Sequence, residues 1–433
     1  MTLDYPVVQH RLGNGLRVVV SEDHTTPSAT VHLHYDAGSR HEAPGRTGLA
    51  HLFEHLMFEG SRNVARGEHA ALMNGCGAVF NGATATDLTV YYQHLPAGAV
   101  ELALWLEADR MATLPDGLSQ ELLDAQRGVI TQEKHQRYAV PFGSIEPRLL
   151  ALVYPSGHPY HHQAIGSLED LHAATLDDVT GFFRAFYSPG NAVLAVTGDV
   201  TPGQVIDAAE RYFGPVPAGP RPSRVPARVL EPATGMARDD AAEQVPFGMT
   251  ALGFRLPPNS VTDPEIFACD LALRILAGGP PSRAHQVLVR DLQAAQQLMA
   301  RTDPRTGGNS LGMIMVPAMP GVPADVTEKV LTAELGALAA DGPGEEELAR
   351  ARAAAEREML AHLSSSTGRA GALAHFTAAF GDPALVNTLP DRITAITPDQ
   401  VRQAAARWLR PESAAIVTIR PDLPPAGGPS FQE

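Results

Sequence analysis

Residues 47–60 constrain the fold more than any other stretch, because large apolar side chains cover most of the circumference of the helix they predict. Thr47 can cap this helix and Gly60 can end it. A helix that is apolar on nearly all sides is expected in a protein interior. The apolar residues are Leu49, Leu52, Phe53, Leu56, Met57 and Phe58. Polar residues inside such a helix therefore need strong partners.

Three polar residues interrupt this helix in the string H-L-F-E-H: His51, Glu54 and His55. Histidines four positions apart share one helix face, so their imidazoles can bind the same ion. Glu54 lies about a third of a turn away, where it can reach a water on that ion. H-x-x-E-H is the inverzincin signature, the reverse of the more common zinc motif H-E-x-x-H. The alternative is that both histidines are core residues with ordinary hydrogen-bond partners.

A catalytic zinc site takes three protein ligands, and Glu133 is the candidate for the third. It lies on a predicted helix over residues 119–138, three positions after Ile130 and four after Val129. A carboxylate on the apolar stripe of that helix points inward, where a cation would stabilise it. The alternative is a solvated carboxylate, as expected for Glu121. The stripe consists of Leu122, Leu123, Gln126, Val129 and Ile130.

Other histidines are weaker candidates for metal binding. A loop rich in Pro and Gly is expected to expose His158, His161 and His162 to solvent or substrate. His32 and His34 alternate along a predicted strand. His135 lies on the far side of the helix that carries Glu133.

The sequence predicts two halves that repeat a mixture of strands and helices. Residues 214–232 are so rich in Pro, Gly and Arg that we expect a linker there, and thus domains over residues 1–225 and 226–433. The similar order of elements indicates a diverged internal duplication. Among the expected elements are strands at 16–21, 29–38, 192–200, 248–255, 311–316 and 414–419, a strand pair within 77–95 broken at Asn81-Gly82, and helices at 100–111, 201–213, 263–276, 283–291 and 344–363. The segment after Arg420 is expected to be disordered.

Composition and charge exclude several classes of protein. Only two cysteines are present, which excludes a disulfide framework. The net charge of −15 argues against nucleic-acid binding and suits a basic peptide, and simple solubility is the alternative explanation. No apolar run reaches the roughly 18 residues of a membrane span. The first residues lack a basic segment followed by an apolar run, so we expect no signal peptide and a cytoplasmic protein.

Several stretches of the sequence resemble the pitrilysin, insulinase and mitochondrial-processing-peptidase family of zinc peptidases. The segment from Met57 to Glu133 also has the length, in residues, that this family uses before its third ligand. Matches in the C-terminal half are weaker. The stretches are TGLAHLFEHLMFEGS, AVFNGATATDLTVYY, EADRM, VITQE, IGSLEDL and FYSPGNAVLAVTGDV, followed by AGGPPSR, EEELARAR and ITPDQVRQAAARWL.

This resemblance implies an α+β fold with two similar domains, each a mostly antiparallel sheet backed by helices, which together form half of a clamshell. It implies a zinc metalloendopeptidase whose N-terminal domain binds Zn²⁺ through His51, His55 and Glu133, with a C-terminal domain free of metal. Glu54 would then be the general base for the zinc-bound water. Peptide would lie along the strand 78–84, near Ala78, Phe80 and Asn81, and add to its edge.

Two departures from the family pattern bear on the partner. Gln126 stands where the family often has a second glutamate. Arg290 matches an arginine that grips substrate, but Gln297 stands where a tyrosine is expected seven residues later. We therefore expect a heterodimer with a similar chain that carries the Arg/Tyr pair, and a homodimer as the second choice. The alternatives to an active peptidase are an inactive scaffold subunit and a peptide-binding module.

Overall fold

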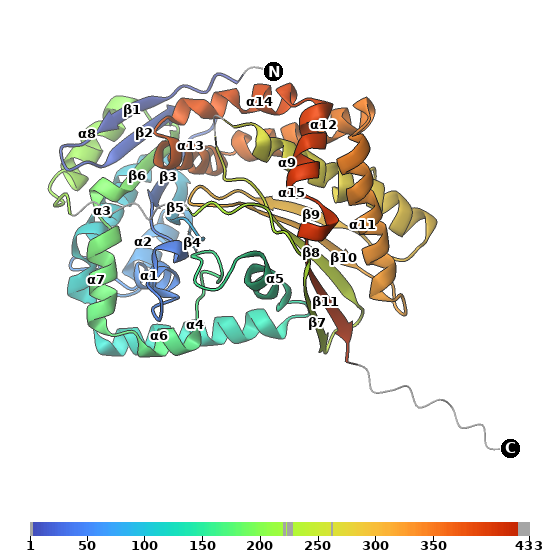
Figure 1. Ribbon diagram of the computed structural model, residues 1–433. Helices are drawn as coiled ribbons and strands as arrows, with labels where there is room; N and C mark the ends of the chain where they lie inside the picture. Colours follow the sequence, from blue (N-terminus) through green and yellow to red (C-terminus); the bar gives the residue numbers. More distant parts are fainter. Residues whose placement is uncertain (1–2, 220–221, 223–227, 261–262, 423–433) are drawn as a thin grey trace. The chain divides into compact units, whose positions relative to one another are not determined.

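The structure is a computed structural model that describes residues 3–219, 222, 228–260 and 263–422 (Figure 1). It contains two compact units, and neither is one continuous stretch of sequence. The first unit takes its described residues from Met1–Lys134, His162–Ala227 and Ala354–Ala395. The second takes them from His135–His161, Arg228–Ala353 and Ile396–Glu433. Each unit is a mostly antiparallel sheet with helices packed on it, so the expected α+β class is confirmed.

The sheet of the first unit has the strand order β1-β2-β6-β3-β5-β4, in which only β2 and β6 run parallel. Strand β4 is therefore at an edge. The predicted break at Asn81-Gly82 is wrong, because both residues pair with β5 and the chain turns between Ala85 and Leu88 instead. The strands are β1 (Val8–Arg11), β2 (Arg17–Glu22), β3 (Ser28–Tyr35), β4 (Val79–Thr84), β5 (Thr89–Pro96) and β6 (Ala192–Gly198).

Helices cover both faces of this sheet. Val31, Leu33 and Tyr35 alternate on β3 toward the main core, as expected, and all are fully buried. The opposite side of β3 is buried as well, because α13 packs across β2, β3 and β6. His32 and His34 therefore lie inside the protein rather than on a solvated face. The helices with residues in this unit are α1 (Leu49–Leu56), α2 (Glu68–Gly75), α3 (Val100–Gly117), α4 (Gln120–Ala139), α6 (Leu168–Ala173), α7 (Leu176–Phe186), α8 (Pro202–Phe213), α12 (Glu345–Ser364), α13 (Ser366–Phe380) and α14 (Leu389–Ala395).

The sheet of the second unit repeats this topology with the order β7-β11-β8-β10-β9. Its strands take the places of β2, β6, β3, β5 and β4 in turn, and β7 and β11 form the single parallel pair. The shared order supports the internal duplication inferred from the sequence. The elements are β7 (Ala237–Glu243), β8 (Met249–Arg255), β9 (Met299–Asp303), β10 (Leu311–Pro317), β11 (Ala415–Pro421), α5 (Ile145–Val153), α9 (Glu265–Ala277), α10 (Arg283–His285), α11 (Ala324–Asp341) and α15 (Pro398–Trp408).

Helices are exchanged between the halves of the sequence. Helix α5 follows α4 in the chain but packs on β7, β8 and β11, whereas α13 comes from the C-terminal half and packs on the first sheet. The change of unit at Ala227–Arg228 is close to the expected domain boundary at 225, but one cut does not assign these helices. Part of the predicted linker, residues 220–221 and 223–227, and the tail from 423 onward lie outside the described residues.

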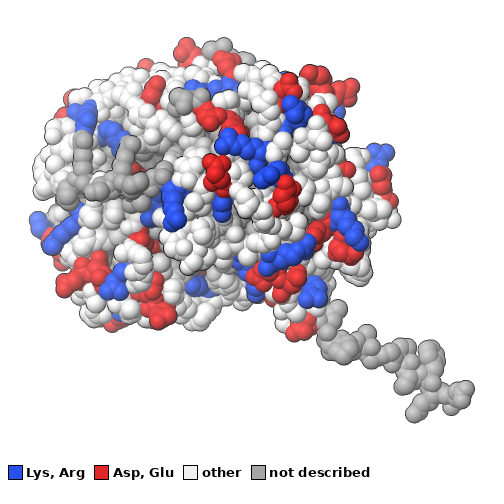
Figure 2. Space-filling view, viewed as in Figure 1, with Lys and Arg blue, Asp and Glu red and all other residues white. Residues whose placement is uncertain are grey.

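Every helix in the described ranges is too short or too polar to cross a lipid bilayer. On the face drawn in Figure 2, acidic and basic side chains are interspersed, and the acidic ones do not form one continuous patch. The acidic side chains on this face are therefore dispersed rather than gathered in one patch.

Candidate metal centre

Helix α1 places His51 and His55 on one face, as their spacing predicts. The side chain of His51 is 8% exposed and that of His55 is 23% exposed. Their ring centroids lie 4.9 Å apart. Leu52, Phe53 and Leu56 are fully buried around them, which accounts for the apolar circumference of the helix. The two imidazoles thus approach each other at the border of a hydrophobic core.

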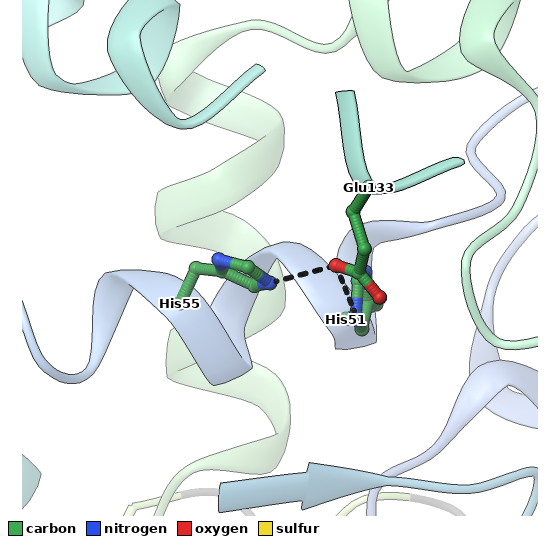
Figure 3. Close-up of side chains that lie close together, drawn as sticks. All are labelled: His51, His55 and Glu133. Atoms are coloured by element: carbon green, nitrogen blue, oxygen red, sulfur yellow. Dashed lines mark ion pairs between the residues drawn. The ribbon is translucent and has the colours of Figure 1, made fainter. Parts of the chain in front are cut away.

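Glu133 reaches the same point from α4 (Figure 3). Its Oε2 lies 3.5 Å from Nε2 of His51 and 3.4 Å from Nε2 of His55. One ligand atom from each of the three side chains lies within 4.8 Å of the others, and no second such group of three occurs in the described part of the chain. The structure therefore brings together the three residues that the sequence singled out.

The buried stripe of α4 differs from the predicted one. Val129 is 48% exposed, so its assignment to the stripe is wrong. Leu123, Gln126 and Ile130 are buried, and Glu133 continues this series at a spacing of three to four residues. The stripe is narrower than predicted because α4 buries a single face. Glu133 still points inward, with a side chain that is 32% exposed.

These three side chains fit a zinc ion in both chemistry and spacing. Two imidazoles and one carboxylate are a known donor set for catalytic zinc. Atoms bound to zinc at about 2.0–2.1 Å in a tetrahedron lie roughly 3.3–3.4 Å apart. The two carboxylate-to-imidazole distances of 3.4 and 3.5 Å match this edge and exceed an ordinary N–H···O hydrogen bond. The pattern suits three ligands around an ion better than a carboxylate bonded to two rings.

Glu54 lies beside the three candidate ligands, under strand β4. A Cβ atom added to Gly82 would be 3.0 Å from Cγ of Glu54, so the glycine gives this side chain its space. Burial raises the pKa of the Glu54 carboxyl, and hydrogen bonds from Thr84 oppose that rise. A carboxylate with a raised pKa is a better proton acceptor near neutral pH.

The expected substrate residues lie on or just before β4. Ala78 precedes the strand, and its N–H is already bound to the carbonyl of Met73. The ring of Phe80 packs against Phe58, with centroids 6.0 Å apart. Asn81 is exposed, and its Oδ1 accepts the N–H of Gly82 at 2.9 Å. The edge can pair with an extended peptide, while these side chains offer little beyond Asn81.

Arg290 belongs to the second unit and is not part of the metal-binding group. It lies in a π-helical turn, Gln286–Asp291, and donates from Nη1 to Oε1 of Gln286 at 3.0 Å. Gln297 is exposed in the same unit. A role for Arg290 in gripping substrate stays a prediction.

The other histidines have different surroundings. His34 lies 6.2 Å from the ring of His375 beneath α13, and His135 is exposed on α4. His161 bonds to the carbonyl of Tyr154 at 2.7 Å. His162 is partly buried, and its Nε2 lies 3.2 Å from Oε2 of Glu42.

Sequence reasoning missed two carboxylates near the candidate centre, Glu42 and Glu59. Glu42 binds backbone N–H groups at the start of α1, and Glu59 accepts a hydrogen bond from Gln126. The predicted cap of α1 at Thr47 is wrong: the N-cap residue is Gly48, and Thr47 binds Asp170. Glu42 had no helical or strand periodicity to single it out. Its role depends on contacts that only the fold creates.

Comparison with known proteins places this fold and these three side chains in a family of peptidases. The family model described as "Insulinase (Peptidase family M16)" matches residues 17–151, which include His51, His55 and Glu133. The model described as "Peptidase M16 inactive domain" matches residues 173–355. The chain therefore belongs to the insulinase family of peptidases, M16.

Individual relatives and solved structures match different shares of the chain. The zinc protease PqqE of Helicobacter pylori is 28% identical over 369 residues, which cover 84% of this chain and 82% of that protein. The mitochondrial-processing peptidase subunit beta of Caenorhabditis elegans is 29% identical over 208 residues, 48% of this chain and 44% of that one. The crystal structure of a protease from Helicobacter pylori has a TM-score of 0.88 at 24% identity, covering 96% of this chain and 100% of that one. A peptidase M16 inactive domain from Pseudomonas fluorescens has a TM-score of 0.84 at 20% identity, covering 96% and 98%. The two structures bear on the fold alone.

Proposed function

We propose that this chain is a zinc metalloendopeptidase, with His51, His55 and Glu133 as metal ligands and Glu54 as general base. The observation that carries this proposal is the approach of one carboxylate to two imidazole nitrogens at 3.4 and 3.5 Å. The names of the relatives, among them a zinc protease, support it. Bound Zn²⁺ would supply Lewis acidity that polarises a peptide carbonyl and makes water more acidic.

The residues of the chain then have distinct tasks in peptide hydrolysis. The edge of β4 binds an extended peptide through backbone hydrogen bonds. Glu54 accepts a proton from the attacking water and returns it to the leaving amine. Its raised pKa makes it better suited to accept that proton.

The assembly we propose is a heterodimer in which a similar chain supplies the Arg/Tyr pair. Gln297, at the position expected for the tyrosine, motivates this proposal. A homodimer is the second choice. Basic peptides are the proposed substrates because of the net charge of −15, although the acidic groups are dispersed on the face in Figure 2.

The test is cleavage of a fluorogenic peptide library by the parent chain, by the variant Glu54→Gln and by the control Glu121→Gln. Each is assayed alone and with a similar chain that lacks H-x-x-E-H. Glu54→Gln should bind zinc like the parent and lose about 10²–10⁴-fold in rate. The control, an exposed carboxylate on α4, should keep full activity. Full activity in Glu54→Gln would refute its role, and peptide binding without cleavage in every mixture would favour the peptide-binding module.

A further inference from the structure

The first turn of α1 has no capping side chain of its own, since its N-cap residue is Gly48. Glu42 takes over this task from outside the helix. Its Oε2 accepts the N–H of Gly48 at 2.9 Å, and its Oε1 accepts the N–H of Ala50 at 2.9 Å. The side chain of Glu42 is completely buried. The helix that carries His51 and His55 thus begins at a buried carboxylate, which also matches the positive end of the helix dipole.

His162 contacts the same carboxylate. Its Nε2 lies 3.2 Å from Oε2 of Glu42, and its side chain is 26% exposed. Burial raises the pKa of Glu42, and the hydrogen bonds that it accepts oppose this rise. A buried carboxylate needs such donors to stay in place. His162 is therefore the outer end of a chain of contacts that leads through Glu42 to the backbone of α1.

The loop from His162 to Ser167 also contacts both segments that carry candidate metal ligands. The N–H of Ser167 donates to Oγ1 of Thr47 at 2.9 Å, just before α1. The carbonyl of Gly166 accepts a hydrogen bond from Lys134, the neighbour of Glu133 on α4. A Cβ atom on Gly166 would lie 2.3 Å from the nitrogen of Gly48, so the backbones are packed too closely for any side chain there.

We propose that Glu42 and His162 are positioning residues for the metal centre, and that they fix the first turn of α1 and with it the imidazoles of His51 and His55. The inference deepens the proposed function and rests on its metal site. Ligands must be held within about 0.5 Å of their working positions to bind a metal well. When the N–H groups of Gly48 and Ala50 lose their acceptor, α1 can shift at the turn that carries His51, and the metal site loosens.

The experiment is a titration of the metal-free full-length chain with Co²⁺, whose d–d absorption reports ligand geometry as well as affinity. The variants are Glu42→Ala, Glu42→Gln, His162→Ala and the double variant Glu42→Ala/His162→Ala. Glu42→Ala should weaken Co²⁺ binding about tenfold, as removal of outer-layer partners does, and change the absorption spectrum. Glu42→Gln keeps one acceptor oxygen and should lie between Glu42→Ala and the parent. The effect of His162→Ala should be smaller and should disappear in the Glu42→Ala background, because His162 acts through Glu42.

The control is Thr201→Ala, which removes the side-chain cap of α8 in the same unit. It should lower the unfolding temperature without changing the Co²⁺ affinity or spectrum. If Glu42→Ala fails to fold by circular dichroism, Glu42→Gln and His162→Ala decide the question. If the parent binds Co²⁺ and the variants bind it equally well, this inference is overturned and the proposed function stays intact. Additive effects of the two residues overturn the role of His162, and a parent that binds no Co²⁺ overturns both proposals.

Discussion

Gln126 donates a hydrogen bond from Nε2 to Oε1 of Glu59, 2.9 Å away. Gln126 is buried on α4, and Glu59 follows the end of α1. Arg66 binds the other oxygen of Glu59 at 2.5 Å. This contact joins the two segments that carry the candidate metal ligands. It explains how the chain accommodates a glutamine where the family often has glutamate, since a carboxylate there would face another carboxylate.

Gln126→Glu should therefore destabilise the protein and bring no gain in peptide cleavage. The donor to Glu59 is lost and two carboxylates face each other, which should cost about 1–3 kcal/mol in the free energy of unfolding. Urea unfolding at pH 7 measures this. Gln136→Glu, at an exposed position on the same helix, is the control and should change little. Unchanged stability with higher activity would show that a glutamate works at this position.

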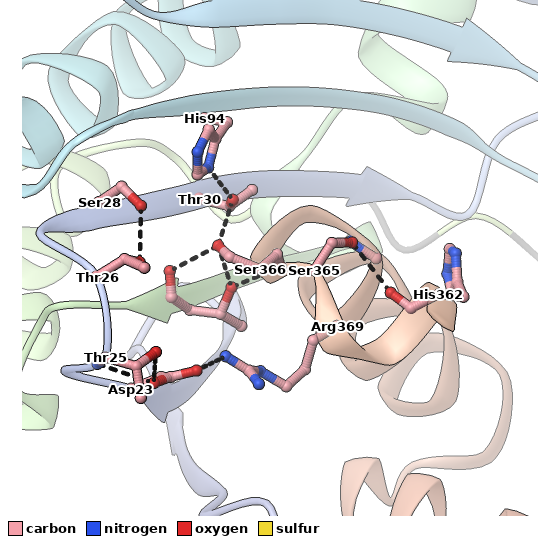
Figure 4. Close-up of polar contacts among 12 residues, drawn as sticks. Asp23, Thr25, Thr26, Ser28, Thr30, His94, His362, Ser365, Ser366 and Arg369 are labelled. Atoms are coloured by element: carbon pink, nitrogen blue, oxygen red, sulfur yellow. Dashed lines mark hydrogen bonds and ion pairs between the residues drawn. The ribbon is translucent and has the colours of Figure 1, made fainter. Parts of the chain in front are cut away.

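Asp23 and Arg369 attach the exchanged helix α13 to the first sheet (Figure 4). Oδ2 of Asp23 accepts from Nη2 of Arg369 at 2.6 Å, and the guanidinium side chain is only 4% exposed. Asp23→Asn leaves this cation buried without its counter-ion, which should cost about 3 kcal/mol in unfolding free energy. Asp199→Asn, which removes the exposed contact with His24, is the control and should have little effect.

The same contact predicts a loss of stability in acid. The hydroxyl of Thr25, then Arg369, holds the pKa of Asp23 at about 2. Because the folded state lowers this pKa, the contribution of Asp23 is present above its ordinary pKa of 3.8 and is lost as the pH falls from about 4 to about 2. Across this window the free energy of unfolding should fall as the pH is lowered, and it should fall more steeply in the parent than in Asp23→Asn. Equal slopes would contradict the assignment.

His32 predicts a second acid effect at higher pH. Burial under α13 lowers its pKa from 6.5 to about 4. The unfolded state therefore takes up a proton that the folded state refuses between pH 6.5 and about 4, and stability falls as the pH is lowered through this range. The slope from one such group is at most about 1.4 kcal/mol per pH unit. His32→Gln should reduce the slope of unfolding free energy against pH, and an unchanged slope would show that His32 does not cause it.

The sequence predicted which three side chains come together at the candidate metal centre because the cues are local. His51 and His55 share a helix face by spacing alone, and Glu133 follows the buried stripe of α4 even though Val129 does not. The features that were missed depend on long-range packing. Thr47 looks like a cap, but Gly48 with Glu42 does that work, since Asp170 binds Thr47.

The errors in the strands have a similar origin. Asn81-Gly82 has the composition of a tight turn, yet the pairing of β4 with β5 runs through both residues. The alternation along β3 predicted one buried face correctly. It could not reveal that α13, from more than 300 residues later in the chain, buries the other face.

The measurement that tests the central claim most directly is the zinc content and zinc affinity of the parent chain beside Glu133→Ala, with Glu121→Ala as the control on the same helix. The account predicts one zinc ion per chain in the parent and in the control. Glu133→Ala should weaken zinc binding by more than about 10–100-fold, which is the loss typical of residues that contact the ligands but not the metal. A parent that binds no zinc after metal repletion, or a Glu133→Ala variant that binds zinc as tightly as the parent, would contradict the proposed metal centre.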